Sequence, residues 1–230
     1  MRIRRTIIAA LALLAAAACS KDNVILYGDT EIGNVVDGRF HSDAGLVYTV
    51  TEQTCDGKLE DDTRVLIICD VLKRTGDKSY DIRLRSFILP LCKQPVAEGV
   101  LSEEDSREDP VSVASAWFGG GYLNINMGVY VLPESETKHV FNLVHYTKAG
   151  SDTLYLDLKH NANGEYFGAP DIKDSDLQSG GLWACFPMEG VVPDGVKSVP
   201  VKLSWMWHRL EDGNMVEDTE RHSLKGVFER

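Results

Sequence analysis

Cys19 is the residue whose surroundings point most directly to a chemical reaction. It follows three arginines within the first five residues and an uncharged run over residues 7–18. A short basic start, an apolar stretch of about 7 to 15 residues and small residues before a cysteine are typical of a signal peptide whose cysteine becomes lipidated. We therefore predict a signal peptide at residues 1–18 and a lipid anchor on Cys19. A transmembrane helix is the alternative, but this run is shorter than the roughly 20 apolar residues that span a bilayer.

Four further cysteines, Cys55, Cys69, Cys92 and Cys185, offer thiol chemistry. In an exported chain an even number favours disulfides, although a chain of this length does not depend on them and buried free thiols fit equally well. If the first strands of the chain pair as a hairpin, Cys55 and Cys92 leave the sheet at the same end, and curvature brings them within the ~7 Å Cα limit of a bridge. They are the candidate disulfide, and two free thiols are the alternative.

The motifs of common hydrolases do not occur in the sequence. There is no G-x-S-x-G, S-x-x-K or H-E-x-x-H, and Gly119-Gly120-Gly121 lacks the Lys-Ser/Thr of a phosphate loop and fits a turn better. The histidines do not pair at metal-ligand spacing, and the aspartates near residue 174 lack the order of a calcium loop. We expect no catalytic residues, no metal and no cofactor. The six histidines are His41, His139, His145, His160, His208 and His222.

The tryptophans could stack on sugar rings, because each combines a large apolar face with one polar group. Trp205 and Trp207 share the phase of the apolar residues in 199–208 and are predicted to lie in a core. The residues around Trp183 do not alternate clearly enough to place its side chain in a core. It is the candidate ligand contact.

The charge of the chain restricts its partners. Removing the three arginines of the leader changes the formal net charge from −11 to −14. Such an acidic protein is repelled by nucleic acid phosphates and attracts cationic partners. We therefore expect no nucleic acid and favour a protein or peptide partner.

The pattern of the N-terminal half predicts strands from residue 38 to about residue 96. Residues 80–85 alternate apolar and polar side chains, and the phase slips at Ser86, which predicts a β-bulge in a bent strand. Several curved strands within ~60 residues favour a small OB-like barrel at residues 38–96. Residues 19–37 are expected to form the lipidated tether.

The second half shows an even more regular β pattern. An acidic run beside proline predicts a solvated linker at residues 97–110. After it, residues 122–131, 154–159 and 199–208 alternate apolar and polar side chains, and the segment before residue 154 predicts a hairpin turn. One-sided antiparallel strands of this kind favour a β-sandwich at residues 111–230. The predicted fold class is all-β, a small OB-like barrel followed by a β-sandwich.

The lipidated cysteine, the β segment with Arg64 to Asp70, and the later strand that opens on Gly121-Tyr122-Leu123-Asn124-Ile125 resemble the NigD-like lipoproteins of Bacteroidetes. This resemblance covers nearly the whole mature chain. It implies an N-terminal OB-like domain, a C-terminal β-sandwich and a role of the bacteriocin-immunity kind. The family supplies no catalytic residues to carry over.

Three functions compete on these grounds. The leading hypothesis is a non-enzymatic cell-envelope lipoprotein, anchored in the outer membrane, that binds a protein or peptide partner. The second is a glycan-binding surface lipoprotein that uses Trp183. The third is a hydrolase assembled from dispersed carboxylates and histidines, which a pocket with perturbed titrating groups would favour.

Overall fold

The computed structural model describes residues 26–192, 195–212 and 214–229. The predicted signal peptide and Cys19, the predicted site of lipidation, lie outside these ranges. Within them, no helix is long and apolar enough to cross a membrane. The helical structure described is one 3₁₀ turn, η1 (Asp174–Asp176), and the remaining regular elements are strands. The chain is all-β, as predicted.

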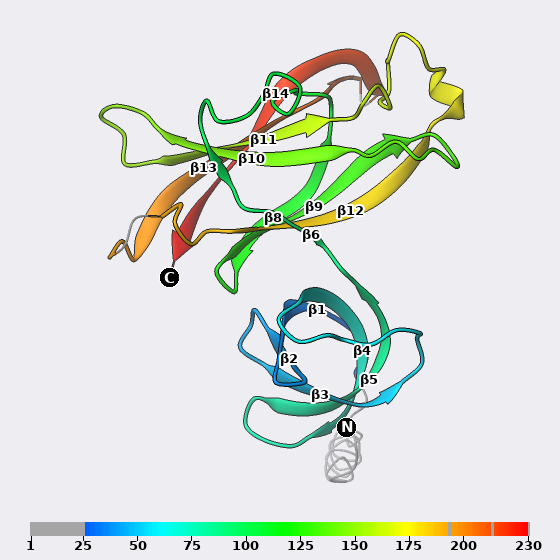
Figure 1. Ribbon diagram of the computed structural model, residues 1–230, viewed down its shortest axis with the longest axis vertical. Helices are drawn as coiled ribbons and strands as arrows, with labels where there is room; N and C mark the ends of the chain where they lie inside the picture. The colour runs from blue at the N-terminus through cyan, green and yellow to red at the C-terminus, as the bar shows by residue number, and fades with distance from the viewer. Residues whose placement is uncertain (1–25, 193–194, 213, 230) are drawn as a thin grey trace, which may run out of the picture.

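The N-terminal unit is a closed five-stranded barrel (Figure 1). The strands are hydrogen-bonded in the order β1-β2-β3-β5-β4, β4 pairs back with β1, and β3 runs parallel to β5. A small five-stranded barrel of this kind confirms the OB-like prediction. The strands are β1 (Leu26–Val36), β2 (Arg39–Ser42), β3 (Val47–Gln53), β4 (Arg64–Arg74) and β5 (Ser79–Ile88).

Alternating apolar side chains of β4 and β5 fill the barrel. Ile67 and Ile82 are fully buried in its core. The pairing of β4 with β5 steps from Ile68 opposite Ser86 to Cys69 opposite Leu84. The residue between Leu84 and Ser86 is therefore the extra residue of a bulge, which confirms the slip predicted at Ser86.

The barrel begins well before residue 38, so the expected tether over residues 19–37 is wrong for its second half. β1 pairs with β2 on one side and β4 on the other, and thereby closes the sheet. Its glycine, aspartate and asparagine residues are typical of turns, which is why the segment was not predicted as a strand. Gly33 is needed there, because a Cβ at this position would lie 2.0 Å from the backbone oxygen of His41.

The C-terminal unit is a sandwich of two sheets, as predicted. One has the order β14-β13-β11-β10-β7 and the other β6-β12-β9-β8. Apolar residues from both sheets form one core, in which Ile125, Leu143, Leu156 and Phe186 are fully buried. The strands are β6 (Leu91–Cys92), β7 (Val96–Ala97), β8 (Ser112–Gly119), β9 (Tyr122–Val131), β10 (Val140–Thr147), β11 (Leu154–Asn161), β12 (Gln178–Pro187), β13 (Ser198–Glu211) and β14 (Asn214–Glu229).

Three local predictions for the sandwich are confirmed. The predicted hairpin joins β10 and β11 through a turn in which Gly150 has a φ of +76°. Trp205 belongs to the core and is 7% exposed, and Trp207 packs against the margin of the core. These features depend on neighbours in sequence, which is why periodicity reveals them.

The connection from the barrel forms part of the sandwich. β6 and β7 follow β5 directly and add parallel edge strands to β12 and β10, respectively. The barrel strands therefore end with β5 at Ile88, and the expected limit at residue 96 is too late. Each of the two sheets takes one edge strand from this short crossover.

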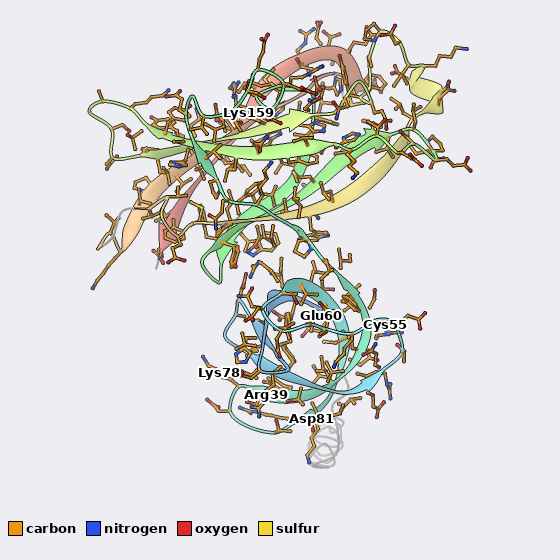
Figure 2. All side chains as sticks on the ribbon, viewed as in Figure 1. Arg39, Cys55, Glu60, Lys78, Asp81 and Lys159 are labelled. Atoms are coloured by element: carbon orange, nitrogen blue, oxygen red, sulfur yellow. The ribbon has the colours of Figure 1, made fainter. Side chains whose placement is uncertain are left out.

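Residues 98–111, here called the acidic strap, pack on the five-stranded sheet. Asn142 Nδ2 donates to the backbone oxygen of Asp105 at 3.0 Å, and the Lys159 ammonium pairs with the Glu108 carboxylate. Figure 2 shows Lys159 on the sandwich beside this loop. The prediction of a solvated linker is wrong here, because hydrogen-bond donors and cations of the sheet bind the strap.

The four described cysteines are free thiols. The expected Cys55–Cys92 bridge is absent, and its premise fails because β3 pairs in parallel with β5 instead of forming a hairpin with β4. Cys55 packs against the barrel core on the flank of the barrel (Figure 2). Cys92 instead lies opposite Cys185 in the pairing of β6 with β12.

Candidate binding site at the barrel–sandwich junction

The outer face of the sheet β6-β12-β9-β8 faces the barrel (Figure 1). Cys92, Cys185, Asn124 and Trp117 are register partners across its strands, so their side chains share one face. The neighbouring residue Ile125 points the other way, into the sandwich core. The row from Cys92 to Trp117 therefore belongs to the junction between the two units.

The barrel meets this face with apolar side chains. Ile32 on β1 and Leu66 on β4 are register partners and are 7% and 3% exposed. Together with Cys185 they form a buried cluster, against which Trp117 and Trp183 pack. The two units are therefore joined by buried apolar surface.

A buried ion pair adjoins the apolar cluster. The side chain of Arg64, 2% exposed, donates from Nη2 to Asp43 Oδ2 at 2.6 Å and to Asn124 Oδ1 at 2.7 Å. Its guanidinium carbon lies 4.0 Å from the centroid of the Tyr122 ring. Burial disfavours the charged guanidinium, but the hydrogen bonds and charge of Asp43 outweigh this effect and raise the pKa of Arg64. Arg64 thus bridges the barrel carboxylate and the sandwich amide.

The turn between β8 and β9 approaches Asp43 very closely. Gly120 and Gly121 have φ of +57° and +84°, a conformation that glycine adopts without strain. A Cβ at Gly119 would lie 2.7 Å from Asp43 Oδ2, and one at Gly120 would lie 2.1 Å from Asp43 Oδ1. The glycine run serves a turn, as predicted, and it also makes room for the barrel.

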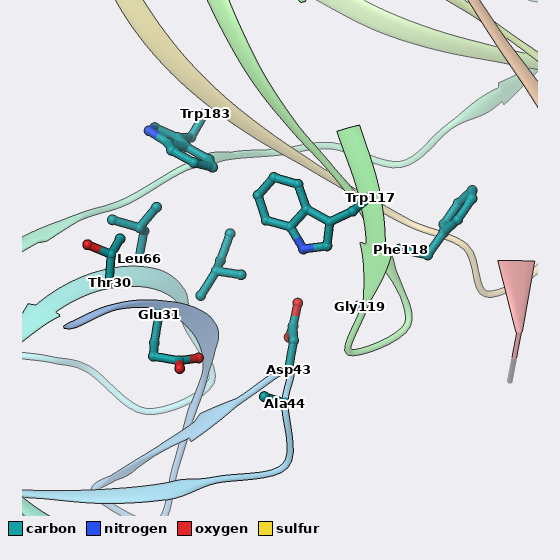
Figure 3. A pocket seen from close by; sticks show the side chains of 10 residues that line it. Thr30, Glu31, Asp43, Ala44, Leu66, Trp117, Phe118, Gly119 and Trp183 are labelled. Carbon is teal, nitrogen blue, oxygen red and sulfur yellow. The ribbon is translucent and has the colours of Figure 1, made fainter. Parts of the chain in front are cut away.

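A pocket of about 360 Å³ opens beside this contact. Trp117 and Trp183 form one wall and meet edge to face, with ring centroids 5.8 Å apart and an interplanar angle of 81°. Figure 3 shows the two indoles above the barrel residues, with Asp43 pointing toward the hairpin that carries Gly119. The exposed residues Thr30 and Ala44 also line it.

Asp43 is the carboxylate that this pocket presents beside the indoles. Glu31 also lines the pocket, but its side chain lies on the side of β1 away from the indoles (Figure 3). There it accepts a hydrogen bond from the Tyr48 hydroxyl at 3.5 Å. Burial and the nearby charge of Asp29 raise the pKa of the Glu31 carboxyl.

Trp183, the predicted ligand contact, lies in this pocket and is half-buried. Its neighbours Trp117, Arg64, Asp43 and Asn124 were not identified from the sequence as members of the site. These residues come from different segments and from both units, so no spacing in the sequence reveals that they meet. The glycine run that closely follows Trp117 was the one local signal.

A second group of titratable residues lies where the strap meets β11. His160 is 1% exposed, and its Nδ1 lies 3.0 Å from the carbonyl oxygen of Pro110. Its Nε2 lies 2.9 Å from Nδ1 of His139. Burial and the neighbouring His139 lower the pKa of His160 to about 4. His160 is therefore neutral at pH 7, and the contacts assign its proton to Nδ1, so that Nε2 accepts from His139.

Ser135 and Glu165 lie next to this histidine pair. The Ser135 hydroxyl donates to Glu165 Oε1, and His139 Nε2 lies 3.9 Å from Glu165 Oε2. Among the described hydrogen bonds the serine is bound to the carboxylate and not to a histidine, so the contact that activates a serine nucleophile is missing. In the described ranges no three His, Cys, Asp or Glu side chains are placed to hold a metal ion.

The sequence profile of the NigD-like C-terminal β-sandwich domain matches residues 94–206. A comparison with curated protein sequences finds no significant match. The profile match begins at the crossover that supplies β7 and covers the acidic strap as well. This agrees with a strap that belongs to the sandwich.

Solved structures share the architecture of this chain. A NigD-like immunity protein from Bacteroides caccae is 19% identical, with a TM-score of 0.60 over 83% of this chain and 90% of that chain. A protein of unknown function from Bacteroides vulgatus is 16% identical, with a TM-score of 0.64 over 88% and 90% of the two chains. A Bacteroides fragilis protein provisionally assigned as a lipoprotein is 14% identical, with a TM-score of 0.58 over 87% and 97%.

At these identities the structural likeness establishes the fold alone, whereas the domain profile identifies the sandwich by its sequence. The barrel in front of it completes the layout expected from the sequence. The chain therefore carries a NigD-like C-terminal β-sandwich domain at residues 94–206, and it shares its architecture of barrel and sandwich with a solved NigD-like immunity protein.

Proposed function

We propose that the protein is a non-enzymatic cell-envelope lipoprotein that binds a peptide or protein partner, in the manner of an immunity protein, at the junction pocket. The observation that carries this proposal is the wall formed by Trp117 and Trp183 beside the Asp43 carboxylate. The NigD-like C-terminal domain and the similarity to a NigD-like immunity protein support it.

The shape and chemistry of the pocket favour an extended, positively charged side chain. A volume of about 360 Å³ is near the lower end of the ~300 to 1,000 Å³ typical of ligand pockets, and suits one or two side chains of a larger partner. The apolar stem of a lysine or arginine would lie along the indoles, whose faces attract cations. Its charged tip would lie near the outer edge of the Asp43 carboxylate, which it would share with Arg64. The strongly negative chain would steer such a partner toward the protein at low salt.

Blocking the pocket from its rim tests the proposal. Ala44→Arg places a long cation among the exposed lining residues, and Ala149→Arg places the same residue in the exposed turn between β10 and β11. The probe is a synthetic peptide of alternating leucine and lysine, with a leucine–glutamate peptide as the charge control. Isothermal titration calorimetry and tryptophan fluorescence report binding.

We expect Ala44→Arg to weaken binding of the lysine peptide at least ~tenfold, about 1.4 kcal/mol, and Ala149→Arg to leave the affinity nearly unchanged. Added salt should slow the association because it screens the long-range attraction. Equal affinities of the two variants, or equal binding of the glutamate peptide, would contradict the proposal.

Glycan capture is the second candidate, because the same two indoles could contact a sugar. Trp183 is half-buried, and its ring meets Trp117 edge to face, so it offers less flat surface for stacking than a free indole does. This arrangement favours the insertion of a side chain. If the protein binds a glycan, if Ala44→Arg abolishes this binding and if no peptide binds, then glycan capture is the function of the pocket and the peptide proposal is wrong.

The lipid anchor is the other part of the proposal. Cys19→Ala should release the folded protein from envelope membranes, because the acyl chains supply the attachment at ~0.8 kcal/mol per buried methylene. Outer and inner membranes separated on a sucrose gradient will locate the unaltered protein, which we expect in the outer-membrane fraction. An alanine variant that stays bound after an alkaline wash would show that something else holds the protein.

A further inference from the structure

Cys92 and Cys185 face each other across two neighbouring strands. They are register partners in the parallel pairing of β6 with β12, and the backbone N–H of Lys93 donates to the Cys185 oxygen at 3.2 Å. Neighbouring strands lie about 4.8 Å apart, which falls within the ~4.4 to 6.8 Å between Cα atoms that a disulfide needs. The pairing places the two thiols next to each other on the same face of the sheet.

The two thiols differ in their surroundings. Cys92 is exposed on a two-residue edge strand, whereas Cys185 is fully buried. The hydrogen bond with Cys185 and the charge of Arg64 lower the pKa of Cys92 to about 7, although partial burial opposes this shift. The hydrogen bond with Cys92 and burial raise the pKa of Cys185. At neutral pH the reactive thiolate therefore forms at the exposed residue, where a reagent in solution can reach it.

We propose that Cys92 and Cys185 form a redox site that an exogenous disulfide oxidises to an intramolecular bridge. The Cys92 thiolate attacks one sulfur of the oxidant, which forms a mixed disulfide and releases one thiolate. Cys185 then loses its proton to water and attacks the Cys92 sulfur, which releases the second thiolate. The two cysteines lose two electrons and two protons, and the oxidant becomes two thiols.

The bridge would secure the point where the chain passes from the barrel to the sandwich. β5 ends at Ile88 and β6 begins at Leu91, so Cys92 lies directly on this crossover. Cys185 belongs to the cluster that also holds Ile32 and Leu66 of the barrel. Oxidation would therefore fix the crossover to the sheet face on which the barrel packs. This inference does not depend on the proposed peptide binding.

The probe for this reaction is glutathione disulfide, added to the full chain purified in detergent. After an acid quench and alkylation, peptide mass spectrometry reports the state of each cysteine. The variants are Cys92→Ser, Cys185→Ser and, as the matched control, Cys55→Ser. We expect the unaltered chain and Cys55→Ser to yield a peptide that links Cys92 to Cys185.

The two site variants separate the steps. Cys185→Ser should accumulate a mixed disulfide between Cys92 and glutathione, because the second thiol is missing. Cys92→Ser should leave Cys185 unmodified at least ~tenfold longer, since burial shields it. Oxidation should also raise the Tm of the unaltered chain and of Cys55→Ser, and leave the Tm of Cys92→Ser unchanged.

Two results would overturn the inference. One is recovery of Cys92 and Cys185 as alkylated thiols after glutathione disulfide treatment of the unaltered chain. The other is a peptide that links Cys92 to Cys55 while Cys185 remains free. Either result would leave the proposed peptide binding untouched, because the Ala44→Arg comparison tests that proposal separately.

Discussion

The two sheets of the sandwich are covered in different ways. The sheet β6-β12-β9-β8 packs against the barrel through an apolar cluster and the buried Arg64–Asp43 ion pair. The sheet β14-β13-β11-β10-β7 carries the acidic strap, which is held by Lys159 and Arg221 through Glu108 and by backbone hydrogen bonds around His160. One cover is a folded unit, and the other is an irregular segment of the chain.

Polar groups at the two covered faces are stabilised in two ways. At the junction, Arg64 stays charged because Asp43 supplies a matching charge and Asn124 accepts a further hydrogen bond. Under the strap, burial and the neighbouring His139 keep His160 neutral, and its described ring hydrogen bonds go to backbone carbonyls and to His139. A buried group therefore keeps its charge only where an opposite charge accompanies it.

Removing the junction cation should have the largest effect on stability. Arg64→Met leaves the Asp43 carboxylate buried without its partner, and breaking one side of such a pair costs about 3 to 5 kcal/mol. Arg74→Met is the matched control, because Arg74 and Asp77 form an exposed pair worth roughly 0 to 1 kcal/mol. Urea unfolding measured by circular dichroism and tryptophan fluorescence will compare the two. Similar losses in both variants would show that the junction pair contributes no more than a surface pair.

Acid should lower the free energy of unfolding through His160, which lies under the strap. The pKa of His160 is lowered to about 4 in the folded protein, and that of an unfolded histidine is about 6.5. The unfolded chain therefore takes up the proton first as the pH falls through 6.5, so this contribution is complete above pH 6.5 and is lost toward pH 4. Between pH 7 and pH 5 the loss should be about 2 kcal/mol.

His160→Gln isolates this contribution from the other titrating groups. Glutamine can still donate to the strap carbonyls, but it does not titrate. The free energy of unfolding of the variant should therefore fall less between pH 7 and pH 5 than that of the unaltered chain. Parallel pH profiles of the two proteins would contradict the assignment to His160.

The smallest of these differences should be the one between two substitutions in the glycine turn at the junction. Gly120→Ala and Gly121→Ala both place alanine at a positive φ, which costs about 1 kcal/mol. A Cβ at Gly120 also meets Asp43, whereas one at Gly121 meets nothing within 4 Å. We expect Gly120→Ala to lower the free energy of unfolding by ~1 to 2 kcal/mol more than Gly121→Ala does. Urea unfolding will measure both losses. Equal losses would mean that the barrel moves aside at no cost.

Much of the fold could be predicted because alternation within one strand is a local property. The buried residues of β9, β11 and β13, the hairpin after β10 and the bulge beside Ser86 all follow from neighbours in sequence. The predictions failed for segments whose partners are distant. β1 looked like a tether because it carries turn-forming residues. The short turn Asp37-Gly38 joins it to β2, but its other partner, β4, lies far along the chain.

The candidate site was predicted only in part for the same reason. Trp183 was identified by type, but Trp117 and Asp43 reach it from other segments of the chain. Cys92 was predicted to pair with Cys55, and the parallel strand β6 places it opposite Cys185 instead. A parallel edge strand leaves no hairpin signal in the sequence, because its partner lies far along the chain.

The expectation of a lipid anchor, the all-β class, the order of the two units and most of the residues that fill each core could be derived without coordinates. Composition and periodicity encode these properties, since they concern residues close together in the chain. The packing of distant segments, by contrast, sets which residues cover each sheet, which thiols meet and which charges are paired. Those outcomes depend on contacts between residues such as Arg64 and Asn124, 60 positions apart, where burial makes each missing partner costly.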